Sequence, residues 1–381
     1  MKPNAIELLA KLVSINSVFP NEKEIGEFLF QHLQKLGFKV RKQVFSTNPE
    51  RFNVLAEKGE GKSLLLYGHM DTVPIYSGWT TNPLALKEEG DKLIGRGTLD
   101  MKAGCAAFLS AIEEFEPKGY KLKIAFGADE ENISEGAHAL AKDEFMKDVI
   151  AVFVSEPAVN NQEHHGPRTL VLGRRGRCDI IVTVKGESAH GALGAGINAI
   201  EEASKIILAL KDLQLAEHEI GKATMFCRKI YSESGSLSVP DNCEFLIDRH
   251  LVPPETPDSA VAQINELIAQ MKKEGILQGN ATADLKQRKT PFLKPYATPK
   301  EHPFTKFVDA CVKEKFGKTY YSYGLSVADD NIFGADLNLP VITIGPKGEG
   351  CHAAGECVLK SSYLELIETY KMLLSRFQTN I

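Results

Sequence analysis

The stretch that decides the fold is LLLYGHMDTVP, residues 64–74. Its first four residues are all apolar, which is typical of a strand buried on both faces in the middle of a sheet. Two polar side chains, His69 and Asp71, follow this strand at once. The carboxyl ends of strands are where open α/β sheets bind their ligands. We therefore expect a layered α/β domain with a functional site at the end of this strand.

The same pattern recurs along the chain, because apolar strands alternate with stretches of helical periodicity. This alternation predicts an α/β domain. The further strands are predicted at residues 38–45, 53–56, 122–126, 149–154 and 341–344, and the helices at 25–36, 101–114, 304–316 and 361–377.

The pattern changes after about residue 175. The predicted order there is strand, helix, strand, strand, helix, over residues 179–185, 198–213, 223–231, 243–251 and 257–273. This order indicates a separate α+β unit of the ferredoxin-like kind. Pro295 and Pro299 mark a return linker. We therefore predict an α/β domain formed by residues 1–176 and 290–381, with an α+β domain at 177–289 inserted in it.

Composition excludes several classes of protein. The 381 residues include 45 Lys and Arg against 50 Asp and Glu, a net charge of −5, whereas nucleic-acid binders carry clustered positive charge. No apolar run approaches the roughly 20 residues of a membrane span, and Glu7 and Lys11 interrupt any signal-peptide pattern. The seven cysteines form no CxxC pair, which argues against a disulfide framework or a cysteine zinc site. We expect a cytoplasmic protein.

Five short motifs place acids and histidines after predicted strands or turns. Each alone has an ordinary explanation: a structural histidine, a helix N-cap at Asp100, or a solvated acidic loop. Together they supply two His, two Glu and one Asp, which suits two divalent cations with nitrogen and oxygen donors and no thiolate. The motifs are GHMDTVP (68–74), GRGTLDMK (95–102), DEE (129–131), SEP (155–157) and GCH (350–352).

Such a ligand set has an obvious use in hydrolysis. A bridging aspartate could hold two ions about 3.5–4 Å apart, where they would activate a shared water. The acidic triplet would leave one carboxylate free to move the proton.

In order and spacing, these motifs resemble the dizinc metallohydrolases that include acetylornithine deacetylase, succinyl-diaminopimelate desuccinylase, aminoacylase and glutamate carboxypeptidase. The resemblance runs from about residue 5 to residue 375 and implies a zinc-exopeptidase-like catalytic domain. It implies that His69 and Glu156 hold one metal, that Glu131 and His352 hold the other, and that Asp100 bridges them. The expected ions are two zinc ions, with cobalt or manganese as alternatives.

The resemblance also implies roles around the metals. Asp71 would orient His69, and Glu130 would be the general base that deprotonates the attacking water and later protonates the leaving amine. The peptide bond between Asp100 and Met101 would be cis, as is common in the family at this position.

The inserted domain resembles the family's lid and dimerisation domain, which implies a homodimer. In GESAH (186–190), His190 would stabilise the oxyanion, in dimeric relatives that of the partner subunit; the alternative is a loop histidine. Arg175 could bind a substrate carboxylate, or be a solvated arginine at the hinge. His250 stands where the family has an arginine and is a candidate for substrate binding. Ile133 and Gly194 are two further departures from the pattern.

The leading interpretation is a metal-dependent amidohydrolase that cleaves the amide bond of an N-acyl amino acid beside a free carboxylate. A small-peptide exopeptidase of the same family is the alternative, and it shares every catalytic residue. A non-catalytic relative would be expected to lose a metal ligand or the general base, whereas this sequence has all five ligand positions and Glu130. A nucleotide-binding protein finds little support, because Asp100 stands where a third glycine belongs and GKS (61–63) leads into a strand.

Overall fold

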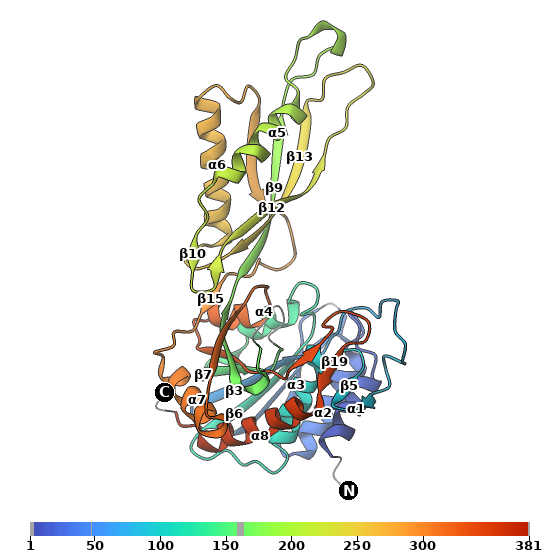
Figure 1. Cartoon of the computed structure of the whole chain (residues 1–381), viewed down its shortest axis with the longest axis vertical. Helices are drawn as coiled ribbons and strands as arrows, with labels where there is room; N and C mark the ends of the chain where they lie inside the picture. The colour runs from blue at the N-terminus through green and yellow to red at the C-terminus, as the bar shows by residue number, and fades with distance from the viewer. Residues whose placement is uncertain (1–3, 47, 158–163, 380–381) are drawn as a thin grey trace. The chain divides into compact units, whose positions relative to one another are not determined.

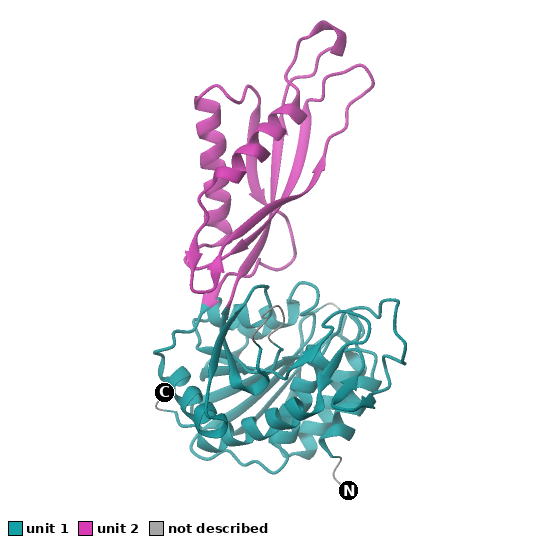
Figure 2. Cartoon of the chain, in the orientation of Figure 1, with its two compact units in different colours: residues 1–173, 297–381 teal, residues 174–296 magenta. Residues whose placement is uncertain are grey.

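The computed structural model describes residues 4–46, 48–157 and 164–379, and the chain divides into two compact units (Figures 1 and 2). Unit 1 comprises residues 1–173 and 297–381, and unit 2 comprises residues 174–296. The sequence predicted the insertion at 177–289. Residues 290–296 belong to unit 2 because the return linker pairs within it: the amide of Arg177 donates to the carbonyl of Leu293 at 2.9 Å.

Unit 1 is built on a mixed sheet. Its described strands follow the order β1-β2-β6-β3-β7-β17-β8-β15, with β16 paired to β8. The four central strands β6, β3, β7 and β17 are parallel to one another, whereas β1, β2 and β8 pair in an antiparallel manner. The strands are β1 (Lys39–Val44), β2 (Phe52–Gly59), β3 (Ser63–His69), β6 (Lys121–Gly127), β7 (Val149–Val154), β8 (Thr169–Arg174), β15 (Tyr296–Ala297), β16 (Tyr320–Gly324) and β17 (Val341–Thr343).

The apolar strand β3 lies in the middle of this sheet, as its composition predicted. Every residue of β3 is buried. Its register sets His69 beside Gly127 of β6, and Tyr67 beside Val154 of β7. The residues that follow these three parallel strands therefore emerge at the same edge of the sheet.

Helices of unit 1 pack on this sheet, and the start of α3 lies close to the end of β7. A Cβ atom on Gly104 would lie 2.2 Å from the carbonyl oxygen of Ser155, so only glycine lets the start of α3 approach the end of β7 this closely. The sequence pattern did not predict α1 or α4. The helices are α1 (Ala5–Ser14), α2 (Lys23–Lys35), α3 (Ala103–Ala111), α4 (Glu135–Ala141), α7 (Pro303–Phe316) and α8 (Lys360–Arg376), with short turns η1 (Thr98–Lys102), η2 (Glu144–Met146), η3 (Gly166–Arg168) and η6 (Ile332–Asp336).

A second small sheet in unit 1 joins two distant parts of the sequence. Its order is β18-β19-β5-β4, and its central pair aligns Cys357 with Ile94. This pairing brings the loop after β5 next to the loop between β18 and β19. The strands are β4 (Lys87–Glu89), β5 (Lys92–Ile94), β18 (Gly348–Glu349) and β19 (Cys357–Leu359).

Unit 2 has its own sheet and its own core. The sheet has the order β12-β13-β9-β14 and is antiparallel throughout. The helices α5 and α6 lie along this sheet (Figure 1), and their apolar side chains share a core with it. The observed order β-α-β-β-α-β is the predicted one plus a final strand, β14. The elements are β9 (Gly176–Lys185), α5 (Ala199–Ala209), β12 (Thr224–Tyr231), β13 (Asn242–Leu251), α6 (Pro257–Lys273) and β14 (Asn280–Leu285), with η4 (Gly191–Leu193), η5 (Leu210–Asp212), β10 (Glu217–His218) and β11 (Gly221–Lys222).

Among the described residues, no helix of either unit has both the length and the apolar character needed to cross a membrane.

Candidate active site

Asp100 is the centre of the predicted site. Its Oδ1 atom lies 3.0 Å from Nε2 of His69, and its Oδ2 atom lies 3.2 Å from Nε2 of His352. Oε2 of Glu131 is also 3.2 Å from Nε2 of His352. The structure thus brings together four of the five predicted metal ligands, from loops that follow β3, β5, β6 and β18. One carboxylate stands between two histidines, as a bridging ligand would.

Two groups of three side chains offer donor atoms within 4.8 Å of one another. One consists of His69, Asp100 and Glu131, and the other of Asp100, Cys351 and His352. The second group includes a sulfur atom that the predicted donor set did not contain, since Cys351 Sγ lies 3.1 Å from Oδ2 of Asp100. The cysteine escaped notice because it has no second cysteine at a metal-binding spacing.

The charges of this cluster fit a cation. Hydrogen bonds from His352 and His69 outweigh burial and lower the pKa of Asp100. Burial would lower the pKa of His69, but its hydrogen bond to Asp100 and the charge of Glu130 raise it. Hydrogen bonding to Asp100 raises the pKa of His352. The carboxylates around the two histidines thus favour positive charge at this place, which a divalent cation would also supply.

Glu131 provides a direct test of this fit. Its side chain is only 8% exposed, and its buried Oε1 atom has no hydrogen-bond partner among the described residues. A buried carboxylate oxygen without a partner is costly unless a cation meets it. The residues present therefore fit a metal centre.

Asp71 connects the end of β3 to the acidic loop. Its buried carboxylate accepts hydrogen bonds from the amides of Glu130 and Glu131, at 3.2 and 2.9 Å. Nδ1 of His69 lies 3.0 Å from the carbonyl oxygen of Asp71 and 3.7 Å from its carboxylate. Burial raises the pKa of Asp71 to about 7. Asp71 therefore positions the two glutamates as well as the histidine.

The three acids after β6 have different environments. Asp129 has a φ of 79°, in the left-handed region. Its buried carboxylate accepts hydrogen bonds from Arg51 at 2.7 Å and from the amide of Glu135 at 2.9 Å. Asp129 therefore holds the loop. Burial raises the pKa of Glu130 well above its ordinary value; the charge of His69 opposes this shift, and that of Glu156 reinforces it. Glu130 thus has the character of a proton-transfer group.

Glu156 follows β7 and is buried, with 7% of its surface exposed. It belongs to neither group of clustered donors among the described residues, although its charge acts on Glu130. Its role as a metal ligand stays a prediction.

A glutamate that the sequence analysis missed holds the loop of Asp100. The carboxylate of Glu356 accepts hydrogen bonds from the amides of Gly97, Leu99 and Asp100, at 3.0, 2.9 and 3.0 Å. It also pairs with the buried guanidinium of Arg96 at 2.6 Å. The sequence signal was an acid four residues after His352.

The turn after Asp100 is also distinctive. The peptide bond between Asp100 and Met101 is cis, as the resemblance implied. Next to it, the buried amine of Lys102 donates to the carbonyl of Ile15 at 2.8 Å. Burial lowers the pKa of Lys102 to about 7.

A model of peptidase family M20/M25/M40 matches residues 65–376. The chain belongs to this family. A probable succinyl-diaminopimelate desuccinylase of Staphylococcus aureus (strain MRSA252) is 30% identical over 236 residues, which are 58% of this chain and 55% of that protein. The chain thus spans about half the length of that relative. An acetylornithine deacetylase of Erwinia tasmaniensis is 28% identical over 327 residues, 81% of this chain and 82% of that protein.

Solved structures agree on the fold of this M20/M25/M40 member. The aminopeptidase PepT of Bacillus cereus ATCC 10987 superposes with a TM-score of 0.79 at 18% identity and covers 98% of both chains. The family model thus confirms the predicted family, and this structural likeness confirms the predicted fold class. The predicted enzyme class, a metallohydrolase of amide bonds, is the class to which this family belongs.

Three further residues predicted for the M20/M25/M40 site lie in unit 2. His190 is exposed, and its Nδ1 accepts a hydrogen bond from the amide of Ala192 at 3.2 Å. Nδ1 of His250 lies 3.5 Å from Oδ1 of Asp248. Burial lowers the pKa of His250, although the charge of Asp248 opposes this shift. The charge of Arg175 contributes to the same lowering. Their roles toward a substrate stay predictions.

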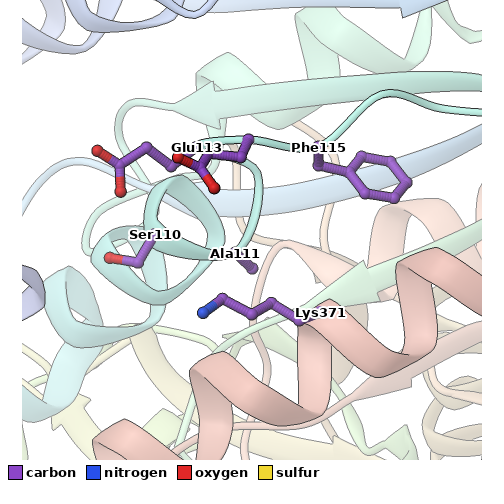
Figure 3. A pocket seen from close by; sticks show the side chains of 6 residues that line it. Ser110, Ala111, Glu113, Phe115 and Lys371 are labelled. Atoms are coloured by element: carbon purple, nitrogen blue, oxygen red, sulfur yellow. The ribbon is translucent and has the colours of Figure 1, made fainter.

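A pocket at the far end of α3 is separate from these groups. It is lined by Ser110, Ala111, Glu113, Phe115 and Lys371 (Figure 3). None of the predicted site residues lines it, so we assign it no part in catalysis.

Proposed function

We propose that this M20/M25/M40 member is a metal-dependent amidohydrolase that cleaves the amide bond of an N-acyl amino acid. The observation that carries this proposal is the Asp100 carboxylate shared between His69 and His352, with the unpartnered oxygen of Glu131 beside it. The match to an acetylornithine deacetylase over most of both chains supports the substrate class.

In this proposal, His69 and Glu156 hold one divalent ion, Glu131 and His352 hold the other, and Asp100 contacts both. Zinc is the expected metal, with cobalt or manganese as alternatives. When bound, such a pair polarises the amide carbonyl and makes water a nucleophile at neutral pH.

Other side chains transfer the proton, stabilise the oxyanion and bind the substrate carboxylate. Glu130 accepts the proton of the attacking water and passes it to the leaving amine, and its raised pKa supports this assignment. His190 stabilises the oxyanion. Arg175 and His250 bind the free carboxylate of the substrate, since a guanidinium can hold a carboxylate through two parallel hydrogen bonds.

A hydrolysis screen tests the proposal. Purified protein loaded with zinc or cobalt is offered N-acetyl- and N-succinyl-amino acids and, in parallel, unblocked di- and tripeptides, each with and without a chelator. Chelator-sensitive release from the acyl substrates is the expected result. Preference for the peptides would replace the deacylase with the exopeptidase, the alternative that shares every proposed catalytic residue. Hydrolysis that persists in the chelator would contradict both.

We also propose that the protein forms a homodimer through unit 2. Strand β12 is an edge strand of its sheet, and it exposes Phe226, Ile230 and Tyr231, which are 52%, 47% and 55% exposed. An exposed apolar edge strand is a template for pairing with another chain. The seven free thiols support the further proposal of a cytoplasmic location.

Ile230→Glu should convert the dimer to a monomer in sedimentation velocity, because it places a charge on the pairing edge. Ile276→Glu is the control, because Ile276 is similarly exposed, at 44%, but lies between α6 and β14. An unchanged dimer in Ile230→Glu would exclude β12 as the interface.

A further inference from the structure

The feature that neither the family motifs nor the proposed function explains is Cys351. Its Sγ atom lies 3.1 Å from Oδ2 of Asp100, the same oxygen that Nε2 of His352 approaches at 3.2 Å. Sulfur, nitrogen and oxygen donors from three side chains thus lie within 4.8 Å of one another. Two neighbouring residues of one loop reach the same carboxylate.

A second observation indicates that a cation belongs at this position. Glu131 contributes Oε2, at 3.2 Å from Nε2 of His352, while its buried Oε1 atom has no hydrogen-bond partner among the described residues. Glu131 thus meets His352 through one carboxylate oxygen, and its other oxygen is buried without a partner among the described residues.

We propose that Cys351 is a ligand of the metal ion held by His352 and Glu131. This inference rests on the proposed function, because that ion is one of the catalytic pair. It adds a sulfur donor to a site otherwise made of imidazole and carboxylate groups. Thiolate ligands favour zinc and cobalt over the harder manganese and magnesium ions. The chain would therefore be selective for softer divalent cations on one side of Asp100.

The bond change is simple. In the protein alone, the thiol donates its hydrogen to Asp100. A cation that arrives accepts the sulfur lone pair, and the thiol proton leaves to the solvent. The competing explanation is that Cys351 only holds the Asp100 carboxylate in place by a hydrogen bond. Serine would preserve that hydrogen bond but not the soft donor, so Cys351→Ser separates the two explanations.

Cobalt spectroscopy provides a readout other than activity. The full chain is reconstituted with Co²⁺, and its near-ultraviolet spectrum is recorded. We expect a sulfur-to-cobalt charge-transfer band in the parent. The band should be lost in Cys351→Ser and in Cys351→Ala. It should persist in Cys227→Ser, which removes an exposed thiol of unit 2.

Metal affinity provides the second readout. Loss of a group that only hydrogen-bonds to a metal ligand typically costs about tenfold to hundredfold in metal affinity, and we expect loss of a ligand to cost at least as much. We expect Cys351→Ser to weaken the binding of Zn²⁺ at one of two sites by at least this factor and to change the binding of Mn²⁺ less. Equal losses for the two ions would overturn the proposed selectivity.

Three outcomes separate this inference from the proposed function. If two Co²⁺ ions bind and amides are hydrolysed but no sulfur band is seen, Cys351 is not a ligand and the hydrolase survives. If the band is unchanged in Cys351→Ala, the sulfur belongs to another residue and the inference is wrong. If the parent binds no Co²⁺, Zn²⁺ or Mn²⁺, both proposals fail.

Discussion

Much of this site depends on Asp100, whose side chain and backbone are both held by hydrogen bonds. Both of its oxygens are taken by histidines, and its backbone amide is fixed by Glu356. None of these three partners is near it in the sequence. His69 lies 31 residues before it and Glu356 lies 256 residues after it.

Glu130→Ala tests the proton-transfer role directly. If Glu130 is the general base, kcat should fall by about a hundredfold or more. The metal content should stay at that of the parent, because Glu130 is not one of the proposed metal ligands. Activity and metal stoichiometry should be measured on the same preparation. Full activity in Glu130→Ala would remove the assignment.

Glu356→Ala should destabilise unit 1, although Glu356 is not one of the residues proposed to contact the metals or the substrate. The substitution leaves the buried Arg96 without its carboxylate and three amides without an acceptor. Breaking a buried pair in this way typically costs about 3–5 kcal/mol.

Urea unfolding measures the change, and Glu349→Ala is the control, because that glutamate pairs with Lys92 at the surface. Equal stability of the two variants would show that Glu356 does not support the loop.

The candidate site could be predicted from the sequence where chemistry alone distinguishes a residue. The histidines and acids of the five motifs were identified in this way. The sequence could not distinguish the structural role of Asp129 from the roles of Glu130 and Glu131. That role depends on a φ of 79° and on a contact with Arg51, both of which exist only in the folded chain. Cys351 and Glu356 were missed because their partner, Asp100, is about 250 residues away.

At the scale of elements, the edge of the sheet opposite the site has its own charged cluster. Asp148, just before β7, accepts hydrogen bonds from the amines of Lys121 and Lys123 on β6 and from the hydroxyl of Ser63 on β3. Although burial opposes the change, these hydrogen bonds lower the pKa of Asp148 to about 2. Three neighbouring strands are thus tied together where they begin.

This cluster predicts a pH-dependent part of the stability. The pKa of Asp148 is lower in the folded protein than the ordinary 3.8. Its contribution is therefore complete above about pH 4 and is lost as the pH falls toward 2. Since the side chain is 33% exposed, we expect Asp148→Asn to cost only about 1 kcal/mol at pH 7, after solvent screening.

The measurement is the free energy of unfolding from pH 7 to pH 2 for the parent and the variant, with the difference shrinking below pH 4. Glu144→Gln, at an 83% exposed glutamate, is the control. A difference that stays constant at low pH would contradict the role of Asp148.

Several elements with strong hydrophobic patterns were predicted well, as β3, β7 and α6 show, although the amphipathic α1 was missed. Two weaker ones were missed for physical reasons. The strand β14 is only partly buried, and its sequence NATADL carries little apolar signal. The helix α4 has only seven residues, too few for its periodicity to be distinct from that of a loop.

At the scale of the whole molecule, metal binding should stabilise one unit and not the other. The clustered donors all belong to unit 1, and unit 2 has a separate core. An ion at a free concentration 100 times its Kd adds about 2.7 kcal/mol for each site. A chelator should therefore lower the unfolding temperature of unit 1 alone.

The single tryptophan makes this measurable. Trp79 lies in unit 1, so its fluorescence follows that unit, while far-ultraviolet circular dichroism follows both units. The fluorescence transition should move with the chelator, and the transition of unit 2 should not. A shift of both transitions by the same amount would mean that the two units unfold together.

The interrupted layout of unit 1 also sets an order of events on the ribosome. Unit 2 is continuous from residue 174 to residue 296, whereas unit 1 needs β17 and the loop with His352 and Glu356 to complete its sheet and its site. A nascent chain therefore exposes a complete unit 2 while the larger unit is still missing a central strand. Unit 2 can therefore fold before unit 1 is complete, which is the reverse of the usual order in which the N-terminal domain folds first. The metal site that we propose can be assembled only after residue 356 has left the exit tunnel.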